Sequence, residues 1–135
     1  MTRETKRVEL LFGRLARDTL TAFPPHMRAV DAPAKPGVYV IYDPAGAVVH
    51  VGRTPRGKGG IRQRLRDHLV NRSSFTRQHL NGEGRRLRDG YTFRYVGVED
   101  ARERALLEAY AIGCLCPAHL GLGEKDVTPI PASAR

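Results

Sequence analysis

A single carboxylate stands in an apolar stretch near the end of the chain. Residues 105–116 read ALLEAYAIGCLC, and Glu108 is the only ionisable carboxylate among them. A helix that is apolar on most faces is buried on most faces, and a buried carboxylate is costly unless it meets a cation or a metal. Because Mg²⁺ is typically held by one or two carboxylates together with water and phosphate, Glu108 is a candidate metal ligand. The alternative is a structural ion pair with one of the many arginines.

An arginine and a histidine lie one helical turn apart in the middle of the chain. Arg64 and His68 are separated by four positions, so on a helix they share a face beside the apolar stripe of Ile61, Leu65 and Leu69. An arginine on a rigid helix can stabilise charge that develops on a phosphate. A histidine can position or accept a proton near neutral pH. The alternative is a solvated face with an ordinary pair of side chains.

The charge of the chain favours a polyanionic partner. The 135 residues include 23 Lys and Arg against 14 Asp and Glu, a formal net charge of +9. Such a charge steers a protein toward nucleic acid first and anionic membrane second. No apolar run reaches membrane length and no charged-then-apolar leader opens the chain, so we expect a cytoplasmic protein without a membrane partner.

A basic, Gly-rich loop follows the second expected strand. Residues 53–60 read RTPRGKGG and lack the Gly-Lys-Ser/Thr ending of a nucleotide-binding loop. We therefore expect this loop to contact a phosphate backbone. The candidate nucleic-acid-binding residues are Arg53, Arg56, Lys58, Arg62 and Arg77.

The two cysteines predict neither a disulfide nor a zinc site. Cys114 and Cys116 are two positions apart, so on a helix they project to different sides and we expect reduced thiols in a cytoplasmic protein. Together with His119 they form the spacing C-x-C-x-x-H, which suits a tetrahedral zinc site poorly and has no fourth ligand nearby.

The apolar pattern predicts the elements that position these side chains. In chain order we expect a helix over 4–22, strands over 37–43 and 47–52, a helix over 61–69, a short helix within 71–90, a strand over 91–98 and a helix from 99 to Pro117. The turn Asp43-Pro44-Ala45-Gly46 joins the first two strands into a β-hairpin. We divide the chain into an N-terminal helical extension (1–30), a main domain (31–123) and a flexible tail (124–135).

The order of the motifs resembles the GIY-YIG nuclease superfamily over about residues 35–121. The features that carry this resemblance are Gly37-Val38-Tyr39, His50-Val51-Gly52, the R-L-x-x-H stretch from Arg64 to His68 and the A-L-L-E stretch that ends at Glu108. The resemblance implies an α+β fold with a small three-stranded mixed or antiparallel sheet flanked by helices, to which this chain adds its N-terminal helix. It also implies one divalent metal, Mg²⁺ or Mn²⁺, on Glu108.

The resemblance assigns roles to several of these residues. Arg64 matches the catalytic arginine that contacts the scissile phosphate, and Tyr39 matches the tyrosine that orients or deprotonates the attacking water. Arg53 stands where the family often has a basic residue, and His68 where several members carry His or Tyr. Two departures are visible: His50 replaces the first Tyr of the second tripeptide, and the family's Asn after the metal-binding Glu is absent near Leu120.

Two hypotheses of different classes follow. The first is a metal-dependent endonuclease that hydrolyses DNA, with RNA left open as a substrate, using Tyr39, His50, Arg64, His68 and Glu108. The second is a catalytically weakened nucleic-acid-binding module of the same fold, for which His50 and the missing Asn argue. A third, weaker possibility is that the arginines bind an acidic protein. The substrate's structure and the oligomeric state are not readable from the sequence.

Overall fold

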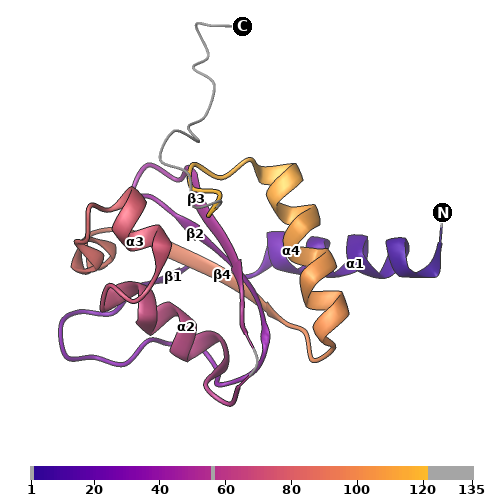
Figure 1. Ribbon diagram of the computed structural model, residues 1–135, viewed down its shortest axis with the longest axis horizontal. Helices are drawn as coiled ribbons and strands as arrows, with labels where there is room; N and C mark the ends of the chain where they lie inside the picture. Colours follow the sequence, from indigo (N-terminus) through magenta and orange to yellow (C-terminus); the bar gives the residue numbers. More distant parts are fainter. Residues whose placement is uncertain (1, 56, 122–135) are drawn as a thin grey trace, which may run out of the picture.

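A four-stranded antiparallel sheet lies between two groups of helices (Figure 1). The computed structural model describes residues 2–55 and 57–121. Its elements in chain order are α1 (Arg3–Arg17), β1 (Thr21–Ala22), β2 (Gly37–Tyr42), β3 (Val48–Arg53), α2 (Gly60–Leu69), α3 (Ser74–His79), the 3₁₀ helix η1 (Gly84–Arg88), β4 (Thr92–Gly97) and α4 (Ala101–Leu115). The predicted α+β class is confirmed.

The β-hairpin and the central position of β2 follow from local sequence. The strand order is β1-β4-β2-β3, so the apolar β2 has a neighbour on each side and β3 is an edge strand. In the turn that joins β2 to β3, the Asp43 carboxylate accepts hydrogen bonds from the backbone N–H of Ala45 and Ala47, both at 2.9 Å. Gly46 takes a positive φ of 91°, a conformation that favours glycine. The predicted hairpin is therefore confirmed.

The sheet has one strand more than predicted, and the first helix is correspondingly shorter. Helix α1 ends at Arg17 rather than near residue 22, and β1 pairs with β4. The change of direction is held at Asp18, whose carbonyl accepts a hydrogen bond from Arg94 (2.7 Å) and whose carboxylate accepts one from the backbone N–H of Tyr95 (3.0 Å). A strand of two residues is too short to show an alternating pattern.

Alternation along β2 divides the core into two halves, one on each face of the sheet. Tyr39 and Ile41 point to the face covered by α2 and α3, whereas Val38 and Val40 point to the face covered by α1 and α4. Helix α1 buries Val8, Leu11 and Leu15 on that second face. Figure 1 shows α1 and α4 together on one side of the sheet and α2 and α3 on the other.

Helix α4 is buried on fewer faces than its sequence suggested. It begins at the Asp100 cap, where the carboxylate accepts from the backbone N–H of Glu103 at 2.9 Å. Its buried residues are only Arg104, Leu107 and Ala111, and Tyr110 is 38% exposed. The helix packs on the sheet and on α1, which leaves its remaining side open. The expectation that α4 is buried on most faces was therefore wrong.

Three remaining sequence expectations have different outcomes. Cys114 and Cys116 are both exposed, and neither forms a disulfide. No helix in residues 2–55 and 57–121 is long and apolar enough to cross a membrane. The predicted tail, residues 124–135, lies outside the described residues, and the division of the chain at residue 30 stays a prediction.

Candidate active site at the sheet edge

Five of the predicted site residues line one hollow beside the edge strand β3. The hollow has a volume of about 220 Å³ and receives side chains from β2, β3, α2 and α4. The predicted residues that line it are Tyr39, His50, Arg53, Arg64 and Glu108. Although these residues are up to 69 positions apart in the chain (108 minus 39), the pairing of β2 with β3 and the packing of α2 and α4 bring them together.

The glycines of the two tripeptides are required by close packing. A Cβ on Gly52 would lie 2.5 Å from Cζ of the Tyr39 ring and 3.1 Å from Nε2 of His50. A Cβ on Gly37 would collide with the backbone carbonyl of Val96. Both positions have a neighbour that cannot move away, because Tyr39 is fully buried and Val96 belongs to the adjacent strand. Gly52 therefore lets the Tyr39 hydroxyl and the His50 ring reach the hollow.

A chain of hydrogen bonds behind Tyr39 assigns its proton to His68. The Thr76 hydroxyl donates to the Ser73 carbonyl (3.1 Å), so the contact between the two hydroxyls (3.1 Å) requires Ser73 to donate to Thr76. Ser73 Oγ then accepts from His68 Nδ1–H (2.6 Å), and His68 Nε2 accepts from the Tyr39 hydroxyl (2.7 Å). This pattern assigns the hydrogen of His68 to Nδ1.

Burial keeps both members of the Tyr39–His68 pair neutral. Removal from water raises the pKa of Tyr39 above its usual range, against the opposing effect of Arg64. Removal from water, together with Arg64 and His119, lowers the pKa of His68 to about 3. Since the Tyr39 hydrogen is directed to His68, the Tyr39 oxygen can act only as an acceptor on its other side, where the Arg64 side chain lies close enough to donate to it and to oppose the rise in pKa.

A second hydrogen-bonded chain supports His50 and includes a histidine that the sequence did not assign to the site. His119 Nε2 donates to Gln78 Oε1 (2.8 Å), so its Nδ1 accepts from His50 Nδ1–H (3.1 Å). Burial lowers the pKa of both histidines, which makes both rings neutral. The unprotonated Nε2 of His50 is thus left as an acceptor beside Gly52.

His119 is brought to the site by the segment that follows α4. Its backbone N–H donates to the Val49 carbonyl of the edge strand at 2.9 Å, and the residue is 7% exposed. The sequence drew attention to His119 only through the C-x-C-x-x-H spacing, which did not point to this site, and through its position beside Leu120, where the resemblance expects an Asn. Its partner Gln78 comes from α3, and no motif pointed to that residue.

The carboxylate of Glu108 faces the hollow with only a loose cationic partner. Arg53 Nη1 lies 3.7 Å from Glu108 Oε1, and the two side chains are 45% and 25% exposed. Burial raises the pKa of the Glu108 carboxyl, while Arg53 and Arg64 act in the opposite direction. Arg64 itself pairs with Asp67 at 3.7 Å. The hollow therefore combines one reachable carboxylate with two guanidinium groups.

The donor set fits a single hard divalent cation. Glu108 is the only carboxylate that lines the hollow among the described residues, and one carboxylate with water and phosphate can hold Mg²⁺. Nowhere in the described ranges do three or more His, Cys, Asp or Glu side chains form a group that could hold a metal by themselves. A cation here would thus depend on Glu108, water and a bound phosphate.

The other predicted residues lie outside the hollow. His68 is fully buried behind Tyr39, and Lys58 is exposed in the loop before α2. Arg62 projects from a different side of α2, where its Nε donates to the Ala32 carbonyl at 2.7 Å. Arg77 is exposed on α3. The remaining predicted contact, Arg56, falls outside the described residues.

Comparisons with known proteins find a likeness among solved structures alone. No protein-family model matches the chain, and no curated protein matches it. Among solved structures, the chain is similar to a GIY-YIG endonuclease domain, which is the family that its motifs resemble. The similar structures are those of the N-terminal endonuclease domain of UvrC from Thermotoga maritima, in two point mutants bound to their catalytic divalent cation. Each match has 24% identity and a TM-score of 0.47, and covers 64% of this chain and 83% of the other.

Proposed function

We propose that this protein is an endonuclease that hydrolyses phosphodiester bonds of DNA with the help of one divalent metal. The observation that carries the proposal is the convergence of Tyr39, Arg64 and Glu108 on one hollow at the sheet edge. Metal-assisted hydrolysis needs three groups: a hydrogen-bond acceptor that orients the attacking water, a cation that binds the phosphate, and a carboxylate that binds the metal.

The neutral side chains of the hollow orient the attacking water. The Tyr39 oxygen accepts a hydrogen bond from this water, because its own hydrogen is donated to His68 Nε2 at 2.7 Å. His50 Nε2 offers a second acceptor beside Gly52. Two fixed acceptors engage the two hydrogens of one water and so direct a lone pair of its oxygen toward the phosphorus, which is how positioning lowers the barrier.

The charged side chains of the hollow bind the phosphate. Arg64 donates to its non-bridging oxygens and stabilises the charge that develops on them. Glu108 would hold Mg²⁺ or Mn²⁺, which when bound polarises the phosphate and stabilises the leaving oxygen. Arg53, the present partner of Glu108 at 3.7 Å, is exposed enough to turn to the phosphate. We place this activity in the cytoplasm, because two exposed free thiols suit a reducing compartment.

A second candidate function is nucleic-acid binding without turnover. The ion pair between Arg53 and Glu108 favours it, since an arginine at this position can neutralise the carboxylate without a metal. The same hollow would then hold a phosphate on Arg64 and Arg53 alone. Binding would need no metal and would survive removal of the Glu108 charge.

A cleavage assay with a matched pair of α4 variants separates the two functions. Purified protein is incubated with labelled DNA that is intact, nicked, branched or single-stranded, and with RNA, in the presence of Mg²⁺, Mn²⁺ or EDTA. We expect metal-dependent cleavage that Glu108→Gln reduces by about 100-fold or more. Glu103→Gln is the control, because Glu103 lies on the same helix and pairs with Arg7 away from the hollow. Cleavage that Glu108→Gln leaves intact, or binding without any cleavage, would contradict the endonuclease.

A further inference from the structure

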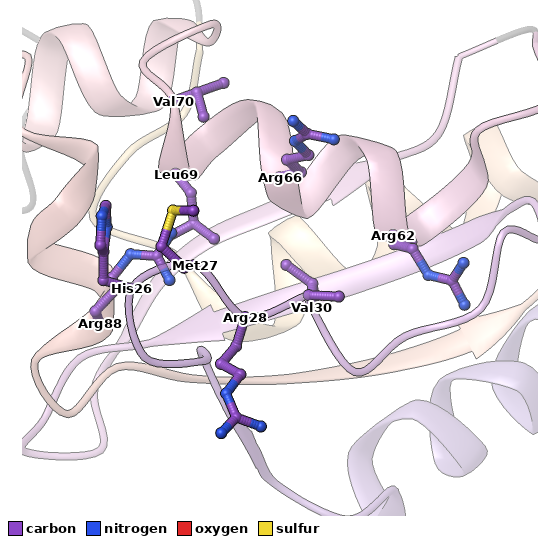
Figure 2. A pocket seen from close by; sticks show the side chains of 10 residues that line it. His26, Met27, Arg28, Val30, Arg62, Arg66, Leu69, Val70 and Arg88 are labelled. Carbon is purple, nitrogen blue, oxygen red and sulfur yellow. The ribbon is translucent and has the colours of Figure 1, made fainter.

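A larger, strongly basic pocket lies on another side of α2. It has a volume of about 440 Å³ and lies between α2 and the loop of residues 26–30 (Figure 2). Four arginines line it, and no carboxylate does so among the described residues: Arg28, Arg62, Arg66 and Arg88. None of the four forms a salt bridge within residues 2–55 and 57–121. Uncompensated guanidinium groups around a concave surface favour an anion, and phosphate above others.

One apolar side chain at the rim of this pocket is almost fully exposed. Met27 is 86% exposed, and Figure 2 shows it on the loop that faces α2. It occupies the third position of a turn closed by the Arg28 N–H and the Pro25 carbonyl at 3.1 Å. Its φ of 69° lies in the left-handed region, where a turn ordinarily uses Gly or Asn. The backbone is thus strained at the residue that displays the apolar side chain.

The loop that carries Met27 is braced rather than loose. Arg88 Nη1 donates to the carbonyls of Pro24 and Pro25 at 2.6 and 2.8 Å, and the two prolines restrict the backbone further. Strain of this kind persists only where the surrounding structure holds it, and it gathers at functional contacts. The backbone that carries Met27 is therefore held in place, and it keeps this side chain beside the arginines.

We propose that this pocket is a second nucleic-acid site, which holds the phosphate backbone on its arginines and inserts Met27 between unstacked bases. An apolar wedge flanked by cations matches the two surfaces of a nucleic acid, because the phosphates are charged and the exposed base faces are apolar. An acidic peptide would offer the charge but no stacked faces for Met27 to enter. This inference rests on the proposed function and adds a substrate class to it: duplexes with an unstacked step, such as nicks, branches or mismatches.

Helix α2 connects this second site to the candidate active site. Arg64 lines the hollow, whereas Arg62 and Arg66 line the basic pocket from the same ten-residue helix. Arg62 and Arg66 are one turn apart, roughly 6 Å along the axis. One bound nucleic acid can therefore cross α2, with its cleavable phosphate at Arg64 and its flanking backbone at Arg62 and Arg66.

Binding measurements in EDTA test this site without depending on cleavage. Fluorescence anisotropy gives the affinities of the full chain for a nicked and an intact duplex of the same sequence, at several salt concentrations. We expect Met27→Gly to weaken binding to the nicked duplex by about tenfold and to leave the intact duplex within about twofold. The same variant should raise Tm by roughly 2–4 °C, because glycine relieves the strained φ. Met27→Leu should restore the affinity, and Leu20→Ala, at another exposed apolar residue (48% exposed), should change nothing.

Arg66→Ala tests the arginines separately from the wedge. We expect it to weaken binding to both duplexes alike, and to reduce by about one the slope of the logarithm of the binding constant against the logarithm of the salt concentration. Arg85→Ala, at a residue outside the pocket, should leave this slope unchanged. Met27→Gly with both affinities unchanged would overturn the wedge. Arg66→Ala with affinity and slope unchanged, or competition by polyglutamate as strong as by DNA, would overturn the nucleic-acid site. If the variants behave as expected but wild-type protein cleaves no substrate, the endonuclease fails and the second site stands.

Discussion

Acid should unfold this protein through its buried histidines. His68 is fully buried, and removal from water, with Arg64 and His119 nearby, lowers its pKa from 6.5 to about 3. Between these two values the unfolded chain binds a proton that the folded protein does not. The stability that the neutral imidazole contributes is therefore complete above pH 6.5 and is lost as the pH falls toward 3.

The size of this loss follows from the width of the pH window. Each pH unit below 6.5 removes about 1.4 kcal/mol from the free energy of unfolding, so at about pH 4.5 the loss through His68 is about 3 kcal/mol. His50 acts in the same direction, because burial and His68 lower its pKa well below 6.5. Since a domain of this size is stabilised by only about 5–15 kcal/mol, the effect is large.

Urea denaturation followed by circular dichroism at pH 7.5 and 4.5 measures the effect in wild type and His68→Gln. The variant keeps a hydrogen-bonding side chain but cannot titrate. We expect it to be less stable at pH 7.5, with the difference in free energy shrinking by about 3 kcal/mol at pH 4.5. His26→Gln is the control, because His26 is exposed. A constant difference between wild type and His68→Gln at both pH values would refute the reasoning.

Three substitutions test the packing and hydrogen bonds around the site by their free energies of unfolding in urea. Gly52→Ala should destabilise the fold by about 1–3 kcal/mol, because the added Cβ overlaps the Tyr39 ring; unchanged stability would show that the ring moves aside freely. Ser73→Ala removes both the acceptor of His68 Nδ1–H and the N-cap of α3, at a cost of about 1–2 kcal/mol. Hydrogen exchange should also speed up in α3, and unaltered protection would contradict the cap. Arg104→Met keeps the buried volume but leaves two backbone carbonyls without their donor, so a loss of about 1–3 kcal/mol is expected and a neutral result would count against it.

The elements that carry the site could be predicted from local pattern. The apolar stripe Ile61, Leu65 and Leu69 predicted α2, which runs over Gly60–Leu69 with these three residues buried. Alternation and the turn at Asp43 predicted the hairpin of β2 and β3. These predictions succeed because periodicity records which side of an element is buried, and each element is long enough to display its period.

The sequence overstated how buried α4 is. The run ALLEAYAIGCLC looks apolar around most of its circumference, yet its buried residues are few and Tyr110 and Cys114 are exposed. Periodicity cannot show how much surface the neighbouring elements offer to a helix. That surface depends here on α1 and the sheet, which cover one side of α4.

The sequence by itself determined the motif order, the positions of β2, β3, β4, α2 and α4, and the basic charge that favours nucleic acid. Only the tertiary structure decided which side chains meet: His50 with His119 and Gln78, His68 with Ser73, and Arg62 with a pocket away from Arg64. The physical reason is how far apart along the chain the interacting residues lie. Helix and strand periods are set by neighbours along the chain, whereas hydrogen bonds between residues as far apart as 50 and 119 depend on how the elements pack.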